Sequence, residues 1–398
     1  MGKNFKTHMK YIYNLSSYIK PGHIISVKKY SAILRREITV FRAYIGDGIN
    51  HKFLSSLPIF NENITSIELK KAYSRNASIV ALDDKDPMKE REIPTLKGKN
   101  VFILVHGLDT TELSGTKEIP LYTQYRRKIV FSSIKEHFPD SVILLYIYPS
   151  ITKRLMDNGK LLIKNVSQLP AIKDSNHVFF IGYSLGGLVV RVALQMSTWL
   201  RNITTKVLTI NTPHRGTPLL SLLTAKKQLW DFLYSTNHPR SVTLLKEASY
   251  IAFQSGTVLA PGHLDLIWEN TEGTPGINEN TLLTTLNKYN KTRNYILVGS
   301  ILPNNKTMQT IRLLSHHLRY EPTERFSLLL CDFIIREFGK LLNIPSFNRS
   351  DGVAPLSSQI PIKYGERLSP STPLIFTGDH LDIVVDRQMW HQALSLLS

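Results

Sequence analysis

The chain has 398 residues, of which 42% are hydrophobic and 20% are charged. This composition is typical of a globular protein and excludes a collagen-like repeat, a coiled coil and a disordered polar chain. The 49 Lys and Arg residues outnumber the 31 Asp and Glu residues, for a net charge of +18. The charge favours an anionic partner, although a genome biased toward Lys raises it equally. We expect no nucleic-acid partner, because no zinc-finger or RNA-recognition signature is present.

Residues 1–36 form a basic N-terminal segment without an acidic residue. No apolar core of secretory-signal length interrupts it, and the longest apolar runs of the chain are far shorter than the roughly 20 residues of a membrane span. The compartment stays open, with a cytoplasmic or membrane-peripheral location favoured. Cys331 is the single cysteine and follows three leucines, which indicates a buried, unreactive thiol rather than a disulfide or a zinc ligand.

From about residue 99 onward, short apolar runs alternate with longer amphipathic segments. The apolar runs are nearly continuous, as in parallel strands that are covered on both faces. The predicted strands are 101–105, 142–148, 178–181, 207–210, 295–298 and 374–376, and the predicted helices between them are 122–137, 152–166 and 185–199. This alternation predicts an α/β fold with a doubly wound, mostly parallel sheet.

Two intervals are too long to be simple crossovers. Residues 218–290 predict a helical cap whose helix 219–233 is either a mobile lid or a cap packed on the core. Residues 303–348 predict a second insertion with a helix over 326–342. The main domain is expected to span 37–398. Within it, the weak strand patterns of 37–98, at 38–41 and 79–82, belong either to the same sheet or to a small appendage.

The strongest chemical signal is the segment Gly182-Tyr183-Ser184-Leu185-Gly186-Gly187. It directly follows a predicted strand and opens a predicted helix, which is the context of a nucleophile elbow. Such a turn exposes the serine oxygen, and the helix N-terminus favours developing negative charge nearby. The alternative is a glycine-rich turn with a capping serine. We therefore expect Ser184 to be a nucleophile.

A second segment, His106-Gly107-Leu108, stands at the end of the predicted strand 101–105. A strand that ends in this way ahead of the nucleophile strand lets the next backbone N–H point into the site. The backbone N–H groups of Leu108 and Leu185 are therefore the expected oxyanion donors. His106 itself is expected to be structural.

A nucleophilic serine needs a base and an orienting carboxylate, which follow it in the order Ser, Asp, His when it stands on such an elbow. His380 is the best-placed base, because it lies in a loop after the last predicted strand. Asp351, in a turn before an extended segment, is the preferred carboxylate, and Asp379 is the alternative. The less favoured histidines are His214, His238, His263, His316, His317 and His391.

Together these segments resemble the α/β-hydrolases, and among them the lipase and serine-esterase branch, over about residues 99–398. Residues 211–218, which include Thr212-Pro213-His214-Arg215-Gly216, look like the post-strand loop of lipases and inositol-deacylase-type esterases. The acid and histidine loops of bacterial triacylglycerol lipases resemble Ser350-Asp351-Gly352-Val353 and Asp379-His380-Leu381-Asp382. The resemblance implies an α/β-hydrolase fold with a cap.

The resemblance also implies an activity, the hydrolysis of carboxylic esters of lipids or other acyl compounds through Ser184, His380 and Asp351, with no cofactor. Acyl transfer or thioester cleavage on the same triad is one alternative, and a non-catalytic, membrane-associated interaction module is another. The basic surface is compatible with peripheral contact to an anionic membrane. The bacterial lipases hold a structural calcium at the position of Asp382. Because Asp332 is the only further ligand on offer, we expect no metal, and Asp382 is predicted to be a helix N-cap.

Overall fold

The computed structural model of the protein describes a large part of the chain. The described residues are 21–31, 36–57, 66–109, 112–114, 124–225, 227–235, 239, 241–243, 245, 248–249, 259–270, 273–290, 294–303, 324–361, 369 and 371–398. Three of the less favoured histidines, His238, His316 and His317, lie outside them, as do parts of both predicted insertions and residues 1–20 of the basic segment.

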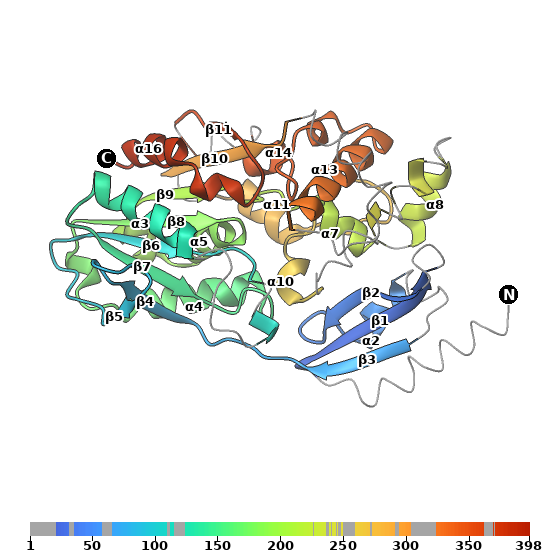
Figure 1. Ribbon diagram of the computed structural model, residues 1–398, viewed down its shortest axis with the longest axis horizontal. Helices are drawn as coiled ribbons and strands as arrows, with labels where there is room; N and C mark the ends of the chain where they lie inside the picture. Colours follow the sequence, from blue (N-terminus) through green and yellow to red (C-terminus); the bar gives the residue numbers. More distant parts are fainter. Residues whose placement is uncertain are drawn as a thin grey trace.

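The body of the molecule is an eight-stranded sheet with the strand order β11-β10-β9-β8-β6-β7-β4-β5 (Figure 1). From β11 to β7 each strand runs parallel to its neighbour, whereas β4 and β5 are antiparallel. The predicted doubly wound, mostly parallel sheet is therefore confirmed. The strands are β4 (Ser78–Leu82), β5 (Glu90–Arg91), β6 (Asn100–Val105), β7 (Val142–Ile147), β8 (His177–Tyr183), β9 (Thr204–Ile210), β10 (Tyr295–Ile301) and β11 (Leu374–Thr377).

Helices cover both faces of this sheet. In β6, Val101, Ile103 and Val105 pack in one hydrophobic cluster with residues of α4 and α5, whereas Phe102 and Leu104 pack in another with residues of α3 and α16. Burial on both faces explains why the strand is apolar at every position. The helices of these layers are α3 (Gln124–His137), α4 (Leu155–Ser167), α5 (Leu185–Met196), α6 (Thr198–Ile203), α11 (Thr281–Lys288), α14 (Leu356–Gln359) and α16 (Arg387–Ser395), with short 3-10 turns at η4 (Ile172–Asp174) and η6 (Asp382–Val385).

A separate antiparallel sheet, with the order β2-β1-β3, lies beside the main sheet (Figure 1). Its elements are β1 (His23–Ser31), β2 (Arg36–Tyr44), the helix α2 (His51–Ser56) and β3 (Ser66–Lys71). The predicted boundary at residue 36 thus falls inside β2, and β1 lies within the basic segment. Both alternatives for 37–98 are realised, because 38–41 belongs to the small sheet and 79–82 to β4 of the main sheet.

The two insertions pack against each other. They contribute α7 (Pro218–Leu223), α8 (Lys227–Ser235), α10 (Pro261–Leu264), α13 (Glu324–Leu341) and η5 (Pro345–Asn348). The prediction of one helix over 219–233 is wrong, because α7 ends at Leu223, with Thr224 as its C-cap, and α8 begins at Lys227. Leu229 and Leu233 of α8 are buried in one cluster with Ile334 of α13, so α8 packs against the second insertion.

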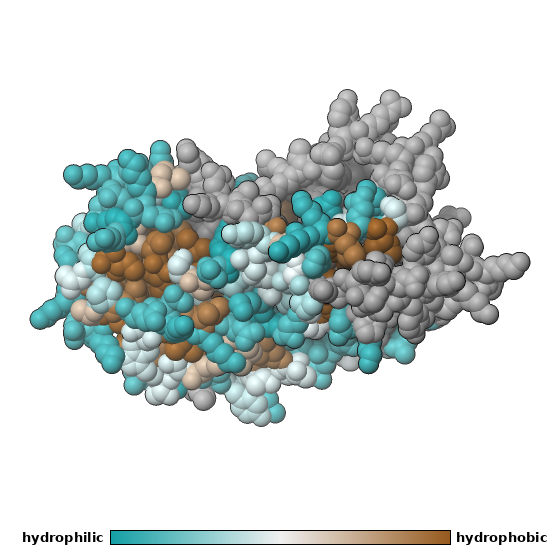
Figure 2. All heavy atoms as spheres, turned by 90° about the horizontal axis from the view of Figure 1, so that it is seen from below, coloured by the Kyte–Doolittle hydropathy of each residue, from teal (hydrophilic) through white to brown (hydrophobic). Residues whose placement is uncertain are grey.

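The surface is mixed in character, with hydrophobic areas between hydrophilic ones on the face that Figure 2 shows. Large exposed apolar side chains are spread over several elements, among them Leu69 of β3, Met156 of α4, Met196 of α5 and Ile375 of β11. In the part of the chain that the structure describes, no helix is both long and apolar enough to cross a bilayer.

Candidate active site

The residues predicted to carry chemistry gather at one edge of the main sheet. Ser184 directly follows β8, Leu108 lies three residues after β6, and His380 lies three residues after β11. Because these strands are parallel, their carboxyl ends meet at the same edge, where open α/β sheets bind their ligands. The sheet thereby brings together side chains that are up to 196 positions apart in the sequence.

The turn at Ser184 is a strained strand-to-helix connection. Ser184 has a φ of 51°, in the left-handed region, and its N–H donates to the Ile210 carbonyl at 2.9 Å. A methyl group at Gly186 would lie 2.1 Å from the Val105 oxygen, and one at Gly187 would lie 2.0 Å from Thr212 Oγ1. The glycines are therefore required by close packing. The side chain of Ser184 does not cap α5, so the alternative of a capping serine is not realised.

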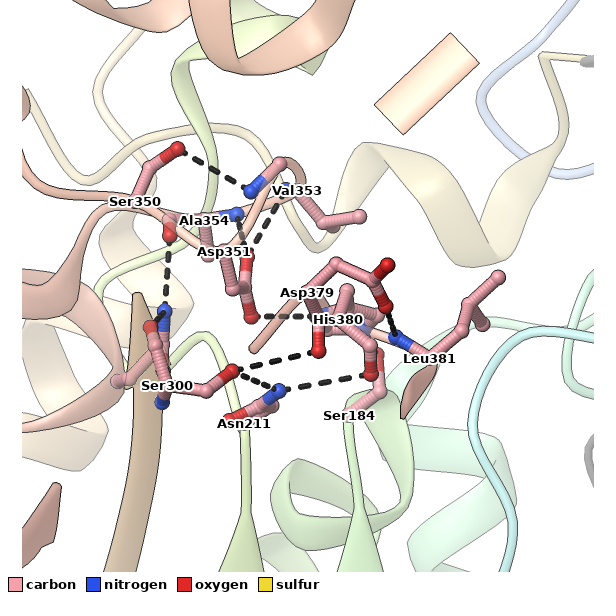
Figure 3. A network of polar contacts seen from close by, with 12 residues as sticks. Ser184, Asn211, Ser300, Ser350, Asp351, Val353, Ala354, Asp379, His380 and Leu381 are labelled. Atoms are coloured by element: carbon pink, nitrogen blue, oxygen red, sulfur yellow. Dashed lines mark hydrogen bonds and ion pairs between the residues drawn. The ribbon is translucent and has the colours of Figure 1, made fainter. Parts of the chain in front are cut away.

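Ser184, His380 and Asp351 form one chain of hydrogen bonds (Figure 3). Ser184 Oγ lies 3.0 Å from His380 Nε2, and His380 Nδ1 lies 2.6 Å from Asp351 Oδ2. All three residues are buried, with Asp351 fully inaccessible. This arrangement can transfer a proton from the serine to the imidazole while the carboxylate stabilises the imidazolium.

The turn around Asp351 leaves only one of its oxygens for His380. The other oxygen, Oδ1, accepts the N–H groups of Val353 at 2.9 Å and Ala354 at 2.8 Å. Asp379, the alternative carboxylate, instead accepts the N–H groups of Leu381 and Asp382. The geometry therefore brings Asp351, and not Asp379, to the imidazole.

A second network holds the loop of His380 from below. The His380 carbonyl accepts from Tyr183 Oη and, at 3.4 Å, from Asn211 Nδ2. Asn211 Nδ2 also donates to Ser300 Oγ at 2.8 Å (Figure 3). The Gln359 side chain accepts the Ser300 N–H at 2.8 Å and donates to the Ser300 carbonyl at 3.2 Å. Sequence reasoning did not assign these positions. The available signal was Asn211, a residue tolerant of left-handed backbone directly after a strand, where its φ is 49°.

The predicted oxyanion donors lie on either side of the nucleophile. A methyl group at Gly107 would lie 2.9 Å from Ser184 Cβ, so the backbone that leads into Leu108 packs against the serine. Leu185 is the first residue of α5, where a backbone N–H has no partner within the helix. Both residues thus lie beside Ser184, which is the position expected of oxyanion donors.

His106 shapes this backbone from inside the protein. Its Nδ1 lies 2.7 Å from the Gly107 carbonyl, and its Nε2 accepts the Tyr148 N–H at 3.4 Å. Burial lowers the pKa of His106 to about 4, which keeps the ring neutral and fits one donor and one acceptor nitrogen. This geometry agrees with the prediction that His106 has a structural role.

The remaining described histidines lie away from the nucleophile. His214 is fully buried and accepts from Arg191 at 3.0 Å, and burial together with the charge of Arg191 lowers its pKa. His263 is buried in α10, and His391 packs edge-on against His137. The segment around His214 therefore serves packing beneath the cap.

No metal cluster forms around the residues considered for calcium. Asp332 accepts from Arg336 at 2.8 Å and from Ser350 at 2.5 Å, and no group of three His, Cys, Asp or Glu side chains suited to a metal occurs among the described residues. Asp382 opens the short turn η6, whereas the N-cap of α16 is Asp386. The N-cap prediction for Asp382 is wrong, because the chain makes another turn before α16 begins.

Cys331 lies on α13 beside the cap core. Burial raises the pKa of its thiol to about 12, so the thiolate is not populated near neutral pH. This agrees with the prediction of an unreactive thiol.

Comparisons with known proteins find a family and several solved structures to which the chain is similar. Residues 153–259 match the family described as PGAP1-like alpha/beta domain, and no curated protein matches the chain. One similar solved structure is the mature lipase BlEst2 of Bacillus licheniformis, with 14% identity, a TM-score of 0.41 and coverage of 80% of this chain and 98% of that chain. A lipase-esterase related protein from Clostridium acetobutylicum has 12% identity, a TM-score of 0.33 and coverage of 81% and 100%. The metagenomic carboxyl esterase MGS0156 has 15% identity, a TM-score of 0.37 and coverage of 77% of each chain. The family match lies within the part of the chain for which a resemblance to α/β-hydrolases is predicted.

Proposed function

Since the chain has the fold of an α/β-hydrolase, we propose that it hydrolyses carboxylic esters through an acyl-enzyme, with Ser184 as nucleophile, His380 as base and Asp351 as its partner. The observation that carries this proposal is the continuous hydrogen-bond chain from Asp351 to Ser184 at the carboxyl edge of the sheet. Lipids or other acyl compounds are the proposed substrates, and no cofactor takes part.

In the first half of the reaction, Ser184 Oγ attacks the carbonyl carbon while its proton moves to His380 Nε2. The carbonyl oxygen becomes an oxyanion and is bound by the N–H groups of Leu108 and Leu185, each donor contributing about 3 kcal/mol. His380 then returns the proton to the leaving alkoxide as the bond to the alcohol breaks. The acyl group remains on Ser184 as an ester.

In the second half, His380 removes a proton from water, whose oxygen attacks the acyl-enzyme. Collapse of this second tetrahedral intermediate releases the carboxylic acid, and the proton returns from His380 to Ser184. An alcohol or a thiol in place of water would complete an acyl transfer instead, so the acceptor is what separates hydrolysis from transfer.

Labelling with a fluorophosphonate, followed by assays on esters of increasing acyl length, tests the proposal. We expect the probe to label the wild type, and we expect Ser184→Ala to be neither labelled nor active. Ser132→Ala is the matched control, since Ser132 lies on α3 and its hydroxyl donates to the carbonyl of Ile129. This control keeps both labelling and turnover.

Two outcomes would contradict the proposal. One is labelling and turnover that persist in Ser184→Ala. The other is folded wild-type protein that stays silent toward the probe and every ester, both alone and with anionic lipid vesicles, which would favour the non-catalytic interaction module. Adding a competing alcohol to active enzyme measures the share of acyl transfer.

A further inference from the structure

The loop that carries Leu108 is fixed to the protein by its polar groups. After Leu108 the chain continues through Asp109 into the short turn η2 (Glu112–Ser114). The Asp109 N–H donates to Ser150 Oγ at 2.8 Å, and Glu112 accepts the N–H of Ile151 at 2.8 Å. These bonds tie the loop after β6 to the loop after β7.

The segment that joins the small sheet to the main sheet runs along the same loop. Three consecutive residues make the contacts. The Tyr73 N–H donates to the Leu113 carbonyl at 3.4 Å, Ser74 Oγ lies 2.7 Å from Thr152 Oγ1, and Arg75 forms an ion pair with Asp109. Residues of the N-terminal part are thereby brought to the loop that contains a proposed oxyanion donor.

The ion pair is the strongest of these contacts. The Asp109 side chain is fully inaccessible, and the Arg75 side chain is 14% exposed. A buried carboxylate that loses its cationic partner is strongly destabilised, so the pair restricts where the backbone of Asp109 can lie. Asp109 directly follows Leu108, and the Leu108 amide can therefore move only as far as Asp109 allows.

Asp109 is also close to the ring that shapes Gly107. The charges of both Asp109 and Arg75 act on the pKa of His106, the former raising and the latter lowering it, against the larger lowering by burial. The stretch from His106 to Asp109 is thus held by a buried ring at one end and by an ion pair at the other.

We propose that Arg75 and Asp109 are positioning residues that hold the Leu108 amide in the oxyanion hole, so that the linker after the small N-terminal sheet contributes directly to turnover. This inference rests on the proposed function. An oxyanion donor acts only when it lies within hydrogen-bond distance of the developing charge, and small displacements are costly. Loss of the ion pair therefore weakens binding of the transition state while leaving binding of the ground-state ester unchanged.

Steady-state kinetics and a tetrahedral inhibitor test this role. The inhibitor is an alkyl trifluoromethyl ketone, to whose carbonyl carbon Ser184 Oγ adds; the proton passes to His380 and the ketone oxygen becomes an oxyanion. For Arg75→Ala we expect kcat to fall about tenfold with a short-chain p-nitrophenyl ester, with KM within about twofold of wild type. The inhibition constant for the ketone rises by a factor similar to the loss in kcat.

Arg201→Ala is the matched control for a lost, partly buried arginine. Arg201 bonds the carbonyls of Leu194 and Gln195 at the end of α5 opposite to Ser184. We expect it to lower the melting temperature while kcat and the ketone inhibition constant stay at the wild-type values. Arg75→Lys keeps the charge but not the planar guanidinium, and recovers part of the kcat lost in Arg75→Ala.

Each outcome decides the matter. Wild type that is neither labelled by a fluorophosphonate nor active overturns the proposed function and this role with it. Active wild type with an unchanged kcat in Arg75→Ala, or with an equal loss in Arg201→Ala, overturns this role alone. If Arg75→Ala does not fold, Arg75→Lys and the double variant Arg75→Ala with Asp109→Asn decide instead, and wild-type kcat and ketone inhibition in both overturn the role.

Discussion

The nucleophile and its two partners are held in place by different means. Ser184 sits on a close-packed turn, where a side chain at Gly186 would meet the backbone of Val105 and His106 and one at Gly187 would meet the Thr212 side chain. The loop of His380 is held by side-chain hydrogen bonds from Asn211 and Ser300 (Figure 3). The loop of Asp351 is held by a side-chain hydrogen bond from Gln359.

This difference decides which substitutions are tolerated in the turn of Ser184 and which in the loops of Asp351 and His380. Added volume is damaging in a close-packed turn, because the neighbouring backbone cannot move away. A removed polar atom is damaging in a buried network, because its partner loses a hydrogen bond that water cannot replace. We therefore expect the elbow to be sensitive to size and the two loops to be sensitive to polarity.

The largest effect is expected for Asp351→Asn, which changes polarity at almost constant size. The amide oxygen still accepts from Val353 and Ala354, so the turn remains. The amide nitrogen faces His380 Nδ1 and favours the imidazole tautomer that cannot accept the Ser184 proton. We expect kcat to fall about 10⁴-fold at little cost in the free energy of unfolding. Kinetics and urea denaturation of the same preparation measure both.

Asp379→Asn is the matched control in the same region. Its side chain accepts hydrogen bonds from the N–H groups of Leu381 and Asp382. The oxygen of an amide side chain accepts these two bonds equally well. We expect kcat to change less than about threefold, because the residue is not bonded to the imidazole. A larger loss in Asp379→Asn than in Asp351→Asn would reverse the assignment of the carboxylate.

Gly186→Ala is expected to show the next largest effect, since its methyl group would lie 2.1 Å from the Val105 oxygen and 2.5 Å from the His106 oxygen. Backbone on both sides must shift, at a cost of more than about 3 kcal/mol in the free energy of unfolding. Gly378→Ala adds the same methyl group in the His380 loop, where no atom of the described residues lies within 4 Å. Urea denaturation should find Gly378→Ala within about 0.5 kcal/mol of wild type. Equal losses in the free energy of unfolding at both glycines would remove the contrast between the turn of Ser184 and the loop of His380.

The same contrast explains what the sequence alone predicts. The elbow is built from adjacent residues, so the order of strand, Gly-x-Ser-x-Gly and helix is visible in one stretch of chain. Asp351 and His380 are predictable from their turns and from chain order. Ser300 and Gln359 carry no such mark, because their roles come from contacts with distant segments.

Local patterns also mislead where tertiary contacts decide. The apolar period of residues 219–233 continues through the break between α7 and α8, so the pattern predicts one helix. The backbone instead leaves the helical conformation after Leu223, at the C-cap residue Thr224. In β1, the alternation of Ile25 and Val27 with polar residues was available as a strand signal, but the basic charge of the segment obscured it.

The free energy of unfolding is also expected to depend on pH through His106. The pKa of this ring is lowered to about 4 in the folded protein, chiefly by burial, against about 6.5 when unfolded. The unfolded chain therefore binds a proton first as the pH falls, and the free energy of unfolding drops between about pH 6.5 and 4, by up to about 3 kcal/mol from this group. Urea denaturation of wild type and His106→Asn across this window measures the difference.

His106→Asn keeps a donor for the Gly107 carbonyl but does not titrate. The buried rings of His214 and His263 are present in both proteins, so their contributions cancel in the difference. We expect the wild type to lose stability more steeply than the variant below pH 6.5. Parallel curves would mean that His106 takes up its proton without unfolding.

The smallest effect is expected for Ser300→Ala, which removes one oxygen from the network beneath His380. Asn211 Nδ2 then keeps only its 3.4 Å bond to the His380 carbonyl, and the carbonyl of Asp379 loses the Ser300 hydroxyl. We expect a loss of about 1–2 kcal/mol in the free energy of unfolding and a severalfold lower kcat at unchanged KM.

In the cap, Ser221→Ala removes an equally buried hydroxyl that accepts from the Trp268 N–H at 3.0 Å. It should cost similar stability but no kcat. Both changes remove one buried hydroxyl. A kcat loss confined to Ser300→Ala would therefore assign that loss to the position of the imidazole, and equal losses would assign it to general loosening of the protein.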